Sequence, residues 1–185
     1  MTVDIKELLA GRTCGMDLDF SFRPELGPEP PVALAGVVFP EDAHASGRIA
    51  GPAGCLRLTL SVTVPWQGEC ARCLTPVSGT LEFGMERTVA EKGTLSHEEE
   101  IADYSDEYLI AERGMLDLTP SLSDAIICYF PEKVLCSPDC PGLCPVCGKP
   151  LSGGDCGCKK DTHDPRWDVL RTMRFPDEET PKKSN

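Results

Sequence analysis

Alternating apolar and polar residues dominate the first two thirds of the chain. Residues 56–64, LRLTLSVTV, place five apolar side chains on one side and polar ones on the other. Residues 16–22 and 80–89 repeat the pattern. A period of two is typical of half-buried strands, so these segments predict antiparallel strands with one face in water.

Less regular segments predict the remaining elements. Residues 24–31 are rich in proline, residues 32–39 and 45–50 are expected to pair across a turn at 40–44, and residues 108–118 are expected to form two strands turning at 112–114. Helical spacing and end signals predict short helices at 4–10, at 119–131 after Thr119-Pro120, and from Asp164-Pro165 onward. In the last helix, Trp167, Leu170 and Met173 share a face.

These elements predict an α+β fold. Its centre is a mainly antiparallel sheet or small open barrel with a few short helices, followed by a C-terminal cysteine-rich zinc-binding segment. We expect a β-rich core with one packing helix at 1–131, a cysteine-rich appendage at 132–160, a helix at 161–175 and a flexible tail at 176–185.

The cysteine-rich segment at 136–158 reads CSPDCPGLCPVCGKPLSGGDCGC and holds six of the chain's 11 cysteines. Four prolines and several glycines keep it out of regular helix, and it has few large apolar side chains. Thiolate coordination of a structural Zn²⁺ can replace the missing core with a binding free energy of roughly 10 kcal/mol or more. The spacing Cys-x-x-Cys-Gly is typical of one half of such a site.

The ligands must be chosen from six candidates. We expect Cys144, Cys147, Cys156 and Cys158, with Cys136 and Cys140 as substitutes. A disulfide knot would need an oxidising compartment, and a thioredoxin-like dithiol would need a βαβ context that the pattern does not predict.

A second Cys-x-x-Cys, at Cys70 and Cys73, follows the 56–64 strand where a hairpin is expected to turn. It is a candidate second zinc pair, although two buried thiols in a turn would be the simpler interpretation. The remaining cysteines, Cys14, Cys55 and Cys128, are expected to be small buried hydrophobic residues.

The formal net charge is −12, which opposes a surface that binds nucleic acid throughout. Residues 96–112 include seven acidic side chains and no Lys or Arg, typical of a solvated loop or of a site for a basic partner. Residues 159–174 form the one basic strip, with five Lys and Arg against three Asp.

His44 and His163 are isolated and expected at the surface. No signal peptide or membrane span is predicted, so we expect a cytoplasmic protein with reduced thiols.

Three features together resemble the YceD family of large ribosomal RNA subunit accumulation proteins. They are the Cys-x-Arg-Cys-Leu at 70–74, the block from Cys136 to Cys158, and Asp164-Pro165-Arg166. The resemblance implies a bacterial or organellar factor needed for normal levels of large-subunit (23S) ribosomal RNA, with no catalytic activity. Some members lack the C-terminal cysteines, which implies that a metal there braces the fold.

The first functional hypothesis is therefore a non-enzymatic ribosome-biogenesis factor. Its partner would be ribosomal RNA of the large subunit or a basic ribosomal protein, with no small-molecule substrate. The candidate contacts are Arg72, Lys159, Lys160, Arg166, Arg171 and Arg174. A zinc-ribbon regulator that binds nucleic acid is the alternative, which the net charge disfavours. A zinc enzyme is the third, and it would need an open metal position that neighbouring thiolates would close.

Overall fold

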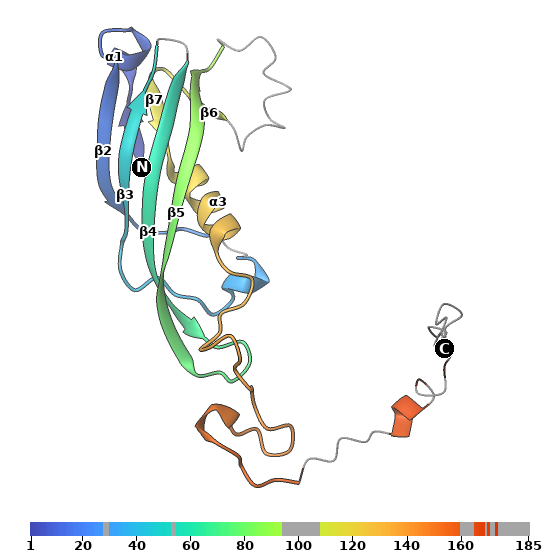
Figure 1. Ribbon diagram of the computed structural model, residues 1–185. Coiled ribbons are helices and arrows are strands. Elements are labelled where there is room, and N and C mark those ends of the chain that lie inside the picture. The colour runs from blue at the N-terminus through green and yellow to red at the C-terminus, as the bar shows by residue number, and fades with distance from the viewer. Residues whose placement is uncertain are drawn as a thin grey trace, which may run out of the picture.

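The computed structural model describes residues 1–27, 30–52, 55–93, 108–159, 165–168, 170 and 173. Most of the described elements are strands, with a few short helices (Figure 1). In order they are β1 (Thr2–Asp4), α1 (Lys6–Leu9), β2 (Gly15–Phe22), η1 (Val32–Leu34), β3 (Ala43–Ala50), β4 (Leu56–Glu69), β5 (Pro76–Glu91), β6 (Tyr108–Ala111), β7 (Met115–Asp117), α3 (Thr119–Tyr129), η3 (Leu151–Gly153) and η4 (Pro165–Trp167).

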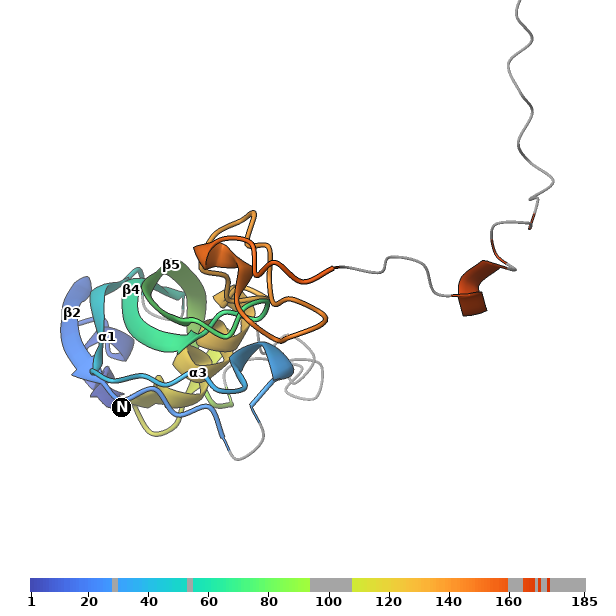
Figure 2. The same cartoon turned by 90° about the horizontal axis from the view of Figure 1, so that it is seen from below.

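The main sheet has five strands in the order β2-β3-β4-β5-β6, and β1 pairs with β7 in a separate two-stranded sheet. Every pair is antiparallel except β5 with β6. The sheet curves around α3 without closing into a barrel (Figure 2). The predicted α+β class with a mainly antiparallel open sheet is thus confirmed.

The alternation of apolar and polar residues in β4 reflects burial of one face of the strand. Its apolar side chains at 56, 58, 60, 62 and 64 are all buried, whereas the intervening positions face solvent. On the exposed face, Arg48 pairs with Asp17 at 2.8 Å and Arg57 pairs with Glu86 at 3.4 Å across neighbouring strands.

Helix α3 closes the core from the other side. It buries Leu122, Ala125 and Ile126 against the sheet. At its C-terminal end, the ring of Tyr129 stacks on Phe83 with centroids 4.8 Å apart. The next residue, Phe130, then packs edge-on against Trp66 at 5.4 Å. These contacts fix the point at which the chain leaves the helix for the cysteine-rich segment.

The β4–β5 hairpin extends well beyond the rest of the sheet. Pairing with β3 ends at Thr63, but β4 continues to Glu69 and β5 begins at Pro76. Beyond β3, the backbones of Val38 and Gln67 exchange two hydrogen bonds of 2.8 and 2.9 Å. The hairpin therefore carries its turn, residues 70–75, away from the main core and next to the cysteine-rich segment (Figure 1).

The predicted strand at 32–39 and its pairing with 45–50 are wrong. Residues 32–39 form a 3-10 turn and one isolated bridge, because Gly36 with φ of 80° interrupts the extended run. As a result, β3 pairs with β2 and β4 and not with this segment. The prediction that residues 108–118 form two strands turning at 112–114 is confirmed: β6 joins the main sheet and β7 pairs with β1.

The prediction that three cysteines are buried is also wrong: Cys14, Cys55 and Cys128 are exposed. The first two precede strands at one end of the sheet, and Cys128 lies on the solvent side of α3.

His44 is exposed as expected, with its Nε2 3.8 Å from Asp19. Most of the acidic run, with His97, and most of the C-terminal helix, with His163, lie outside the described residues. Among the described helices, none has the length and hydrophobicity to cross a membrane.

Close strand packing at Gly47 gives a test of the sheet register. A Cβ at Gly47 would lie 2.0 Å from the Thr59 carbonyl oxygen, whereas at Gly84 the nearest atom would be 3.9 Å away. We therefore expect Gly47→Ala to lower the free energy of unfolding by about 1–3 kcal/mol. The matched variant Gly84→Ala should be neutral or slightly stabilising. Urea denaturation measures both, and equal effects would contradict the register.

Candidate metal centres

The turn of the β4–β5 hairpin has the backbone pattern of a metal-binding knuckle. The N–H of Cys70 donates to the Thr75 carbonyl at 2.9 Å, and the N–H of Leu74 donates to the Cys70 carbonyl at 2.9 Å. Leu74 adopts a left-handed conformation with φ of 59°, which is unfavourable for a residue other than glycine. The turn holds Cys70 and Cys73 on the same side.

The turn at 144–149 repeats this pattern. The N–H of Cys144 donates to the Lys149 carbonyl at 2.8 Å, and the N–H of Gly148 donates to the Cys144 carbonyl at 2.8 Å. Gly148 takes the left-handed position, with φ of 72°, that Leu74 takes in the first turn. The chain therefore contains two equivalent Cys-x-x-Cys knuckles, although only one has the glycine that marks such a turn in sequence.

The first knuckle receives its other two cysteines from the segment after α3. The N–H of Ala71 donates to the Val134 carbonyl at 2.8 Å, which brings this segment alongside the hairpin turn. The guanidinium of Arg72 donates to the carbonyls of Pro138 and Cys140, at 3.2 and 3.0 Å. These contacts hold the segment around Cys140 against the knuckle.

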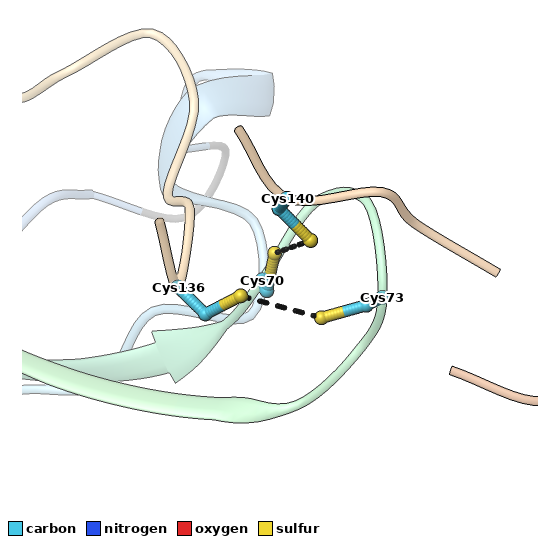
Figure 3. Close-up of side chains that lie close together, drawn as sticks. All are labelled: Cys70, Cys73, Cys136 and Cys140. Carbon is cyan, nitrogen blue, oxygen red and sulfur yellow. Dashed lines mark hydrogen bonds between the residues drawn. The ribbon is translucent and has the colours of Figure 1, made fainter. Parts of the chain in front are cut away.

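Four sulfurs meet at this point. The Sγ atoms of Cys70 and Cys140 are 3.7 Å apart, and those of Cys73 and Cys136 are 3.6 Å apart (Figure 3). All four lie within 4.8 Å of one another, and we name this set the hairpin cluster. Cys70, Cys73 and Cys140 are buried, whereas Cys136 is exposed.

The second knuckle is completed by the two cysteines that follow it. The sulfurs of Cys144, Cys147, Cys156 and Cys158 also lie within 4.8 Å of one another, and we name this set the C-terminal cluster. Its only fully buried member is Cys144; Cys156 and Cys158 are half-buried and Cys147 is exposed. The C-terminal cluster is therefore more open to solvent than the hairpin cluster.

Both sets fit a tetrahedral thiophilic ion. Sulfurs bound to Zn²⁺ at about 2.3 Å in a tetrahedron stand about 3.8 Å apart, close to the two distances in the hairpin cluster. All 11 cysteines are free, so the clusters are not disulfides. Four thiolates without a carboxylate or histidine favour a structural Zn²⁺ over Mg²⁺ or Ca²⁺.

The protonation of these groups shows what a cation would change. Burial raises the pKa of Cys70, but backbone N–H groups directed at its sulfur outweigh burial and lower the pKa to about 6. The N–H of Cys147 similarly helps to lower the pKa of Cys144 to about 6. Hydrogen bonding with the Cys140 sulfur raises the pKa of Cys136 to about 12. A bound divalent cation would let all four members of a set be thiolates, because it offsets their mutual repulsion.

The structure thus brings together the four ligands expected first, Cys144, Cys147, Cys156 and Cys158. The expected substitutes, Cys136 and Cys140, lie instead with Cys70 and Cys73. Sequence spacing could not show this, because more than 60 residues separate the two pairs.

Of the six predicted RNA-contact residues, the structure describes three. Arg72 is exposed, but its guanidinium also joins the two halves of the hairpin cluster, a role that the sequence did not suggest. Lys159 and Arg166 are described and exposed. The remaining three, Lys160, Arg171 and Arg174, lie outside the described residues.

Comparisons with known proteins agree with the sequence resemblance. The family model described as "Large ribosomal RNA subunit accumulation protein YceD" matches residues 58–174. Uncharacterized proteins of Mycobacterium tuberculosis and Mycobacterium bovis are each 35% identical over 127 residues, which cover 66% of this chain and 58% of each relative. One of Mycobacterium leprae is 33% identical over 117 residues, or 63% of this chain and 52% of the relative. The chain thus spans little more than half the length of these relatives, and no solved structure matches it.

Metal content tests the two clusters separately. We expect protein prepared without chelator to carry two equivalents of Zn²⁺. The double variants Cys70→Ser/Cys73→Ser and Cys144→Ser/Cys147→Ser should each retain one, because no cysteine is shared between the sets. Cys14→Ser/Cys128→Ser, which removes two exposed cysteines outside both clusters, should retain two. Elemental analysis decides this, and one equivalent in the unmodified protein would contradict the assignment.

Chelation kinetics test the difference in burial. An excess of chelator should remove the two ions in two phases, with the C-terminal cluster losing its ion first because only one of its four sulfurs is fully buried. A colorimetric zinc indicator follows the release. The fast phase should vanish in Cys144→Ser/Cys147→Ser, and its persistence in that variant would contradict the prediction.

Proposed function

This chain belongs to the YceD family, whose model covers β4 through both clusters and into the C-terminal segment, and on that basis we propose that it is a non-enzymatic ribosome-biogenesis factor. It supports the synthesis, processing or stability of large-subunit (23S) ribosomal RNA. The family match carries this proposal, because it includes all eight clustered cysteines and the Asp164-Pro165-Arg166 motif.

The chemistry of the clusters supports a role without catalysis. A catalytic zinc keeps one position open for water or substrate, usually beside three protein ligands. Each cluster here offers four sulfurs, enough to fill a tetrahedral shell. Zn²⁺ would supply a cross-link within the hairpin cluster and another within the C-terminal cluster. The residues that hold it would thereby brace the fold, and they leave no coordination site for a reaction.

The distribution of charge supports RNA contact through the C-terminal strip. Two acidic side chains on the exposed sheet face already have arginine partners, Asp17 with Arg48 and Glu86 with Arg57. These two carboxylates are therefore less available to a basic protein. The strip, with Lys159, Lys160, Arg166, Arg171 and Arg174, has a local excess of positive charge. Such a strip acts within a Debye length of about 8 Å despite the net charge of the chain.

Charge substitutions test which surface is used. Changing Arg166, Arg171 and Arg174 to Ala should weaken co-sedimentation with large-subunit precursors. It should also reduce the salt slope of ribosomal RNA binding by up to about 0.7–0.9 per lost phosphate contact. The matched control changes Arg12, Arg23 and Arg57 to Ala and so removes the same charge from other exposed sites. It should leave co-sedimentation and the salt slope unchanged.

Neutralising the acidic run tests the competing partner. In this variant, Gln or Asn replaces the acidic residues Glu98, Glu99, Glu100, Asp103, Asp106 and Glu107. If it no longer co-sediments with large-subunit precursors while the C-terminal triple variant still does, the partner is a basic ribosomal protein. RNA contact through the strip would then be wrong. Duplex DNA serves as a further competitor: equal affinity for DNA and ribosomal RNA would favour the zinc-ribbon regulator.

A further inference from the structure

The two Cys-x-x-Cys knuckles differ at one position in a way that folding alone does not explain. Leu74 and Gly148 occupy equivalent places, and both have a left-handed backbone, with φ of 59° and 72°. Glycine adopts this conformation without strain, whereas leucine does not. The Leu74 side chain gains little from the core in return, because it is 58% exposed. Backbone strain at an exposed apolar residue is typical of a ligand-binding position.

Leu74 lines a hollow of about 570 Å³ beside the hairpin cluster. The walls come from the η1 loop, the hairpin turn and the segment after α3, and their apolar residues include Val32, Val37, Ala71, Leu74 and Val134. A second hollow of about 480 Å³ adjoins the first and shares Gly36 and Glu69 with it. We name the two hollows together the hairpin groove. The larger one has the size and the apolar lining of a site for a bulky side chain.

Backbone hydrogen bonds fix the walls of the hairpin groove. The N–H of Ala71 donates to the Val134 carbonyl at 2.8 Å and joins the hairpin turn to the segment after α3. The two hydrogen bonds between Val38 and Gln67 hold the residues after η1 against β4. The groove is therefore shaped before a ligand binds, which lowers the entropic cost of binding.

The backbone of Glu69 is placed to pair with an extended ligand. Successive residues of a strand direct their N–H and C=O groups to alternate sides. Cys70 donates its N–H toward β5, to the Thr75 carbonyl, whereas Gln67 pairs with Val38 on the opposite side. Glu69 therefore directs its N–H and C=O to the side of Val38. Among the described backbone hydrogen bonds between the η1 loop and β4, none involves Glu69.

The charged side chains of the groove favour a cationic ligand. Glu69 lines both hollows, and Glu132 lines the larger one together with a single cation, Lys133. Both carboxylates are exposed, and within the described part of the chain neither has an ion pair. They would repel the phosphates of RNA. Apolar walls, carboxylates and an unpaired strand backbone together suit a polypeptide.

We propose that the hairpin groove binds an extended segment of a partner protein that carries a bulky apolar residue next to a Lys or Arg. The apolar side chain lies against Leu74 in the larger hollow, and the cation faces Glu69 and Glu132. The backbone of the segment pairs with that of Glu69. This site goes beyond the proposed function, because its surface and its ligand both differ from the RNA contact through the C-terminal strip.

A phage-displayed library of random nine-residue peptides, selected on the full chain, tests the proposal. Enriched peptides should combine an aromatic or large aliphatic residue with Lys or Arg within two positions. Fluorescence anisotropy of labelled synthetic copies then measures affinity. Leu74→Gly should weaken binding at least tenfold, yet unfold at an equal or higher urea concentration because it relieves the left-handed strain. Val146→Gly, which removes an exposed side chain from the second knuckle, should leave affinity unchanged.

Two further variants test the groove outside the knuckle. Val32→Lys changes a side chain that is 93% exposed, so it should leave the core intact and still weaken binding at least tenfold. Glu69→Gln should weaken binding severalfold and reduce its dependence on salt. The matched variant Glu82→Gln, at an exposed position of β5, should change neither.

Three results would overturn the proposal. The first is a selection that enriches no peptide, or only peptides without the apolar and cationic pair. The second is unchanged affinity in either Leu74→Gly or Val32→Lys. The third is another occupant: displacement of the peptide by 23S ribosomal RNA, or a dimer that Leu74→Gly dissociates. The affinity measurements contain no RNA, so a failure of RNA contact through the C-terminal strip would not affect them.

Discussion

The convergence of four sulfurs at the end of the β4–β5 hairpin is the constraint on which the hairpin turn and the segment after α3 depend. The hairpin turn lies beyond the main core, and the buried residues of its own small cluster are Cys70, Cys73 and Cys140. Partly buried Val77, Leu135 and Leu143 add little apolar surface. A few hydrogen bonds alone contribute about 1 kcal/mol each, whereas a structural zinc site supplies roughly 10–16 kcal/mol. A Zn²⁺ held by these four sulfurs would therefore decide whether this end of the molecule has one shape.

That constraint explains how the two parts of the chain are joined. The sheet and α3 are stabilised by ordinary hydrophobic burial, with a continuous core from Val3 to Val134. The cysteine-rich segment has no comparable core and is fixed to the hairpin through the Arg72 guanidinium, the Ala71–Val134 hydrogen bond and the hairpin cluster. A single region thus connects fold stability with the candidate metal site.

Local sequence patterns predicted the structural features that depend on neighbouring residues. The alternation in β4 follows from burial of one face, and the Cys-x-x-Cys-Gly turn at 144–148 follows from backbone geometry, so both were predictable. Long-range pairing has no such signature. The sequence placed Cys136 and Cys140 nearest to Cys144, but the path of the chain after α3 brings them to Cys70 and Cys73. The hairpin knuckle could be offered only as a candidate zinc pair for a related reason, since Leu74 stands where glycine would mark the left-handed turn.

The most direct test of this account is a crystal structure with an anomalous difference map recorded at the zinc absorption edge. The account predicts two peaks per chain. One should be bound by Cys70, Cys73, Cys136 and Cys140, and the other by Cys144, Cys147, Cys156 and Cys158, each with sulfurs at about 2.3 Å. A single peak, or an ion bound by Cys136 and Cys140 together with Cys144 and Cys147, would contradict it.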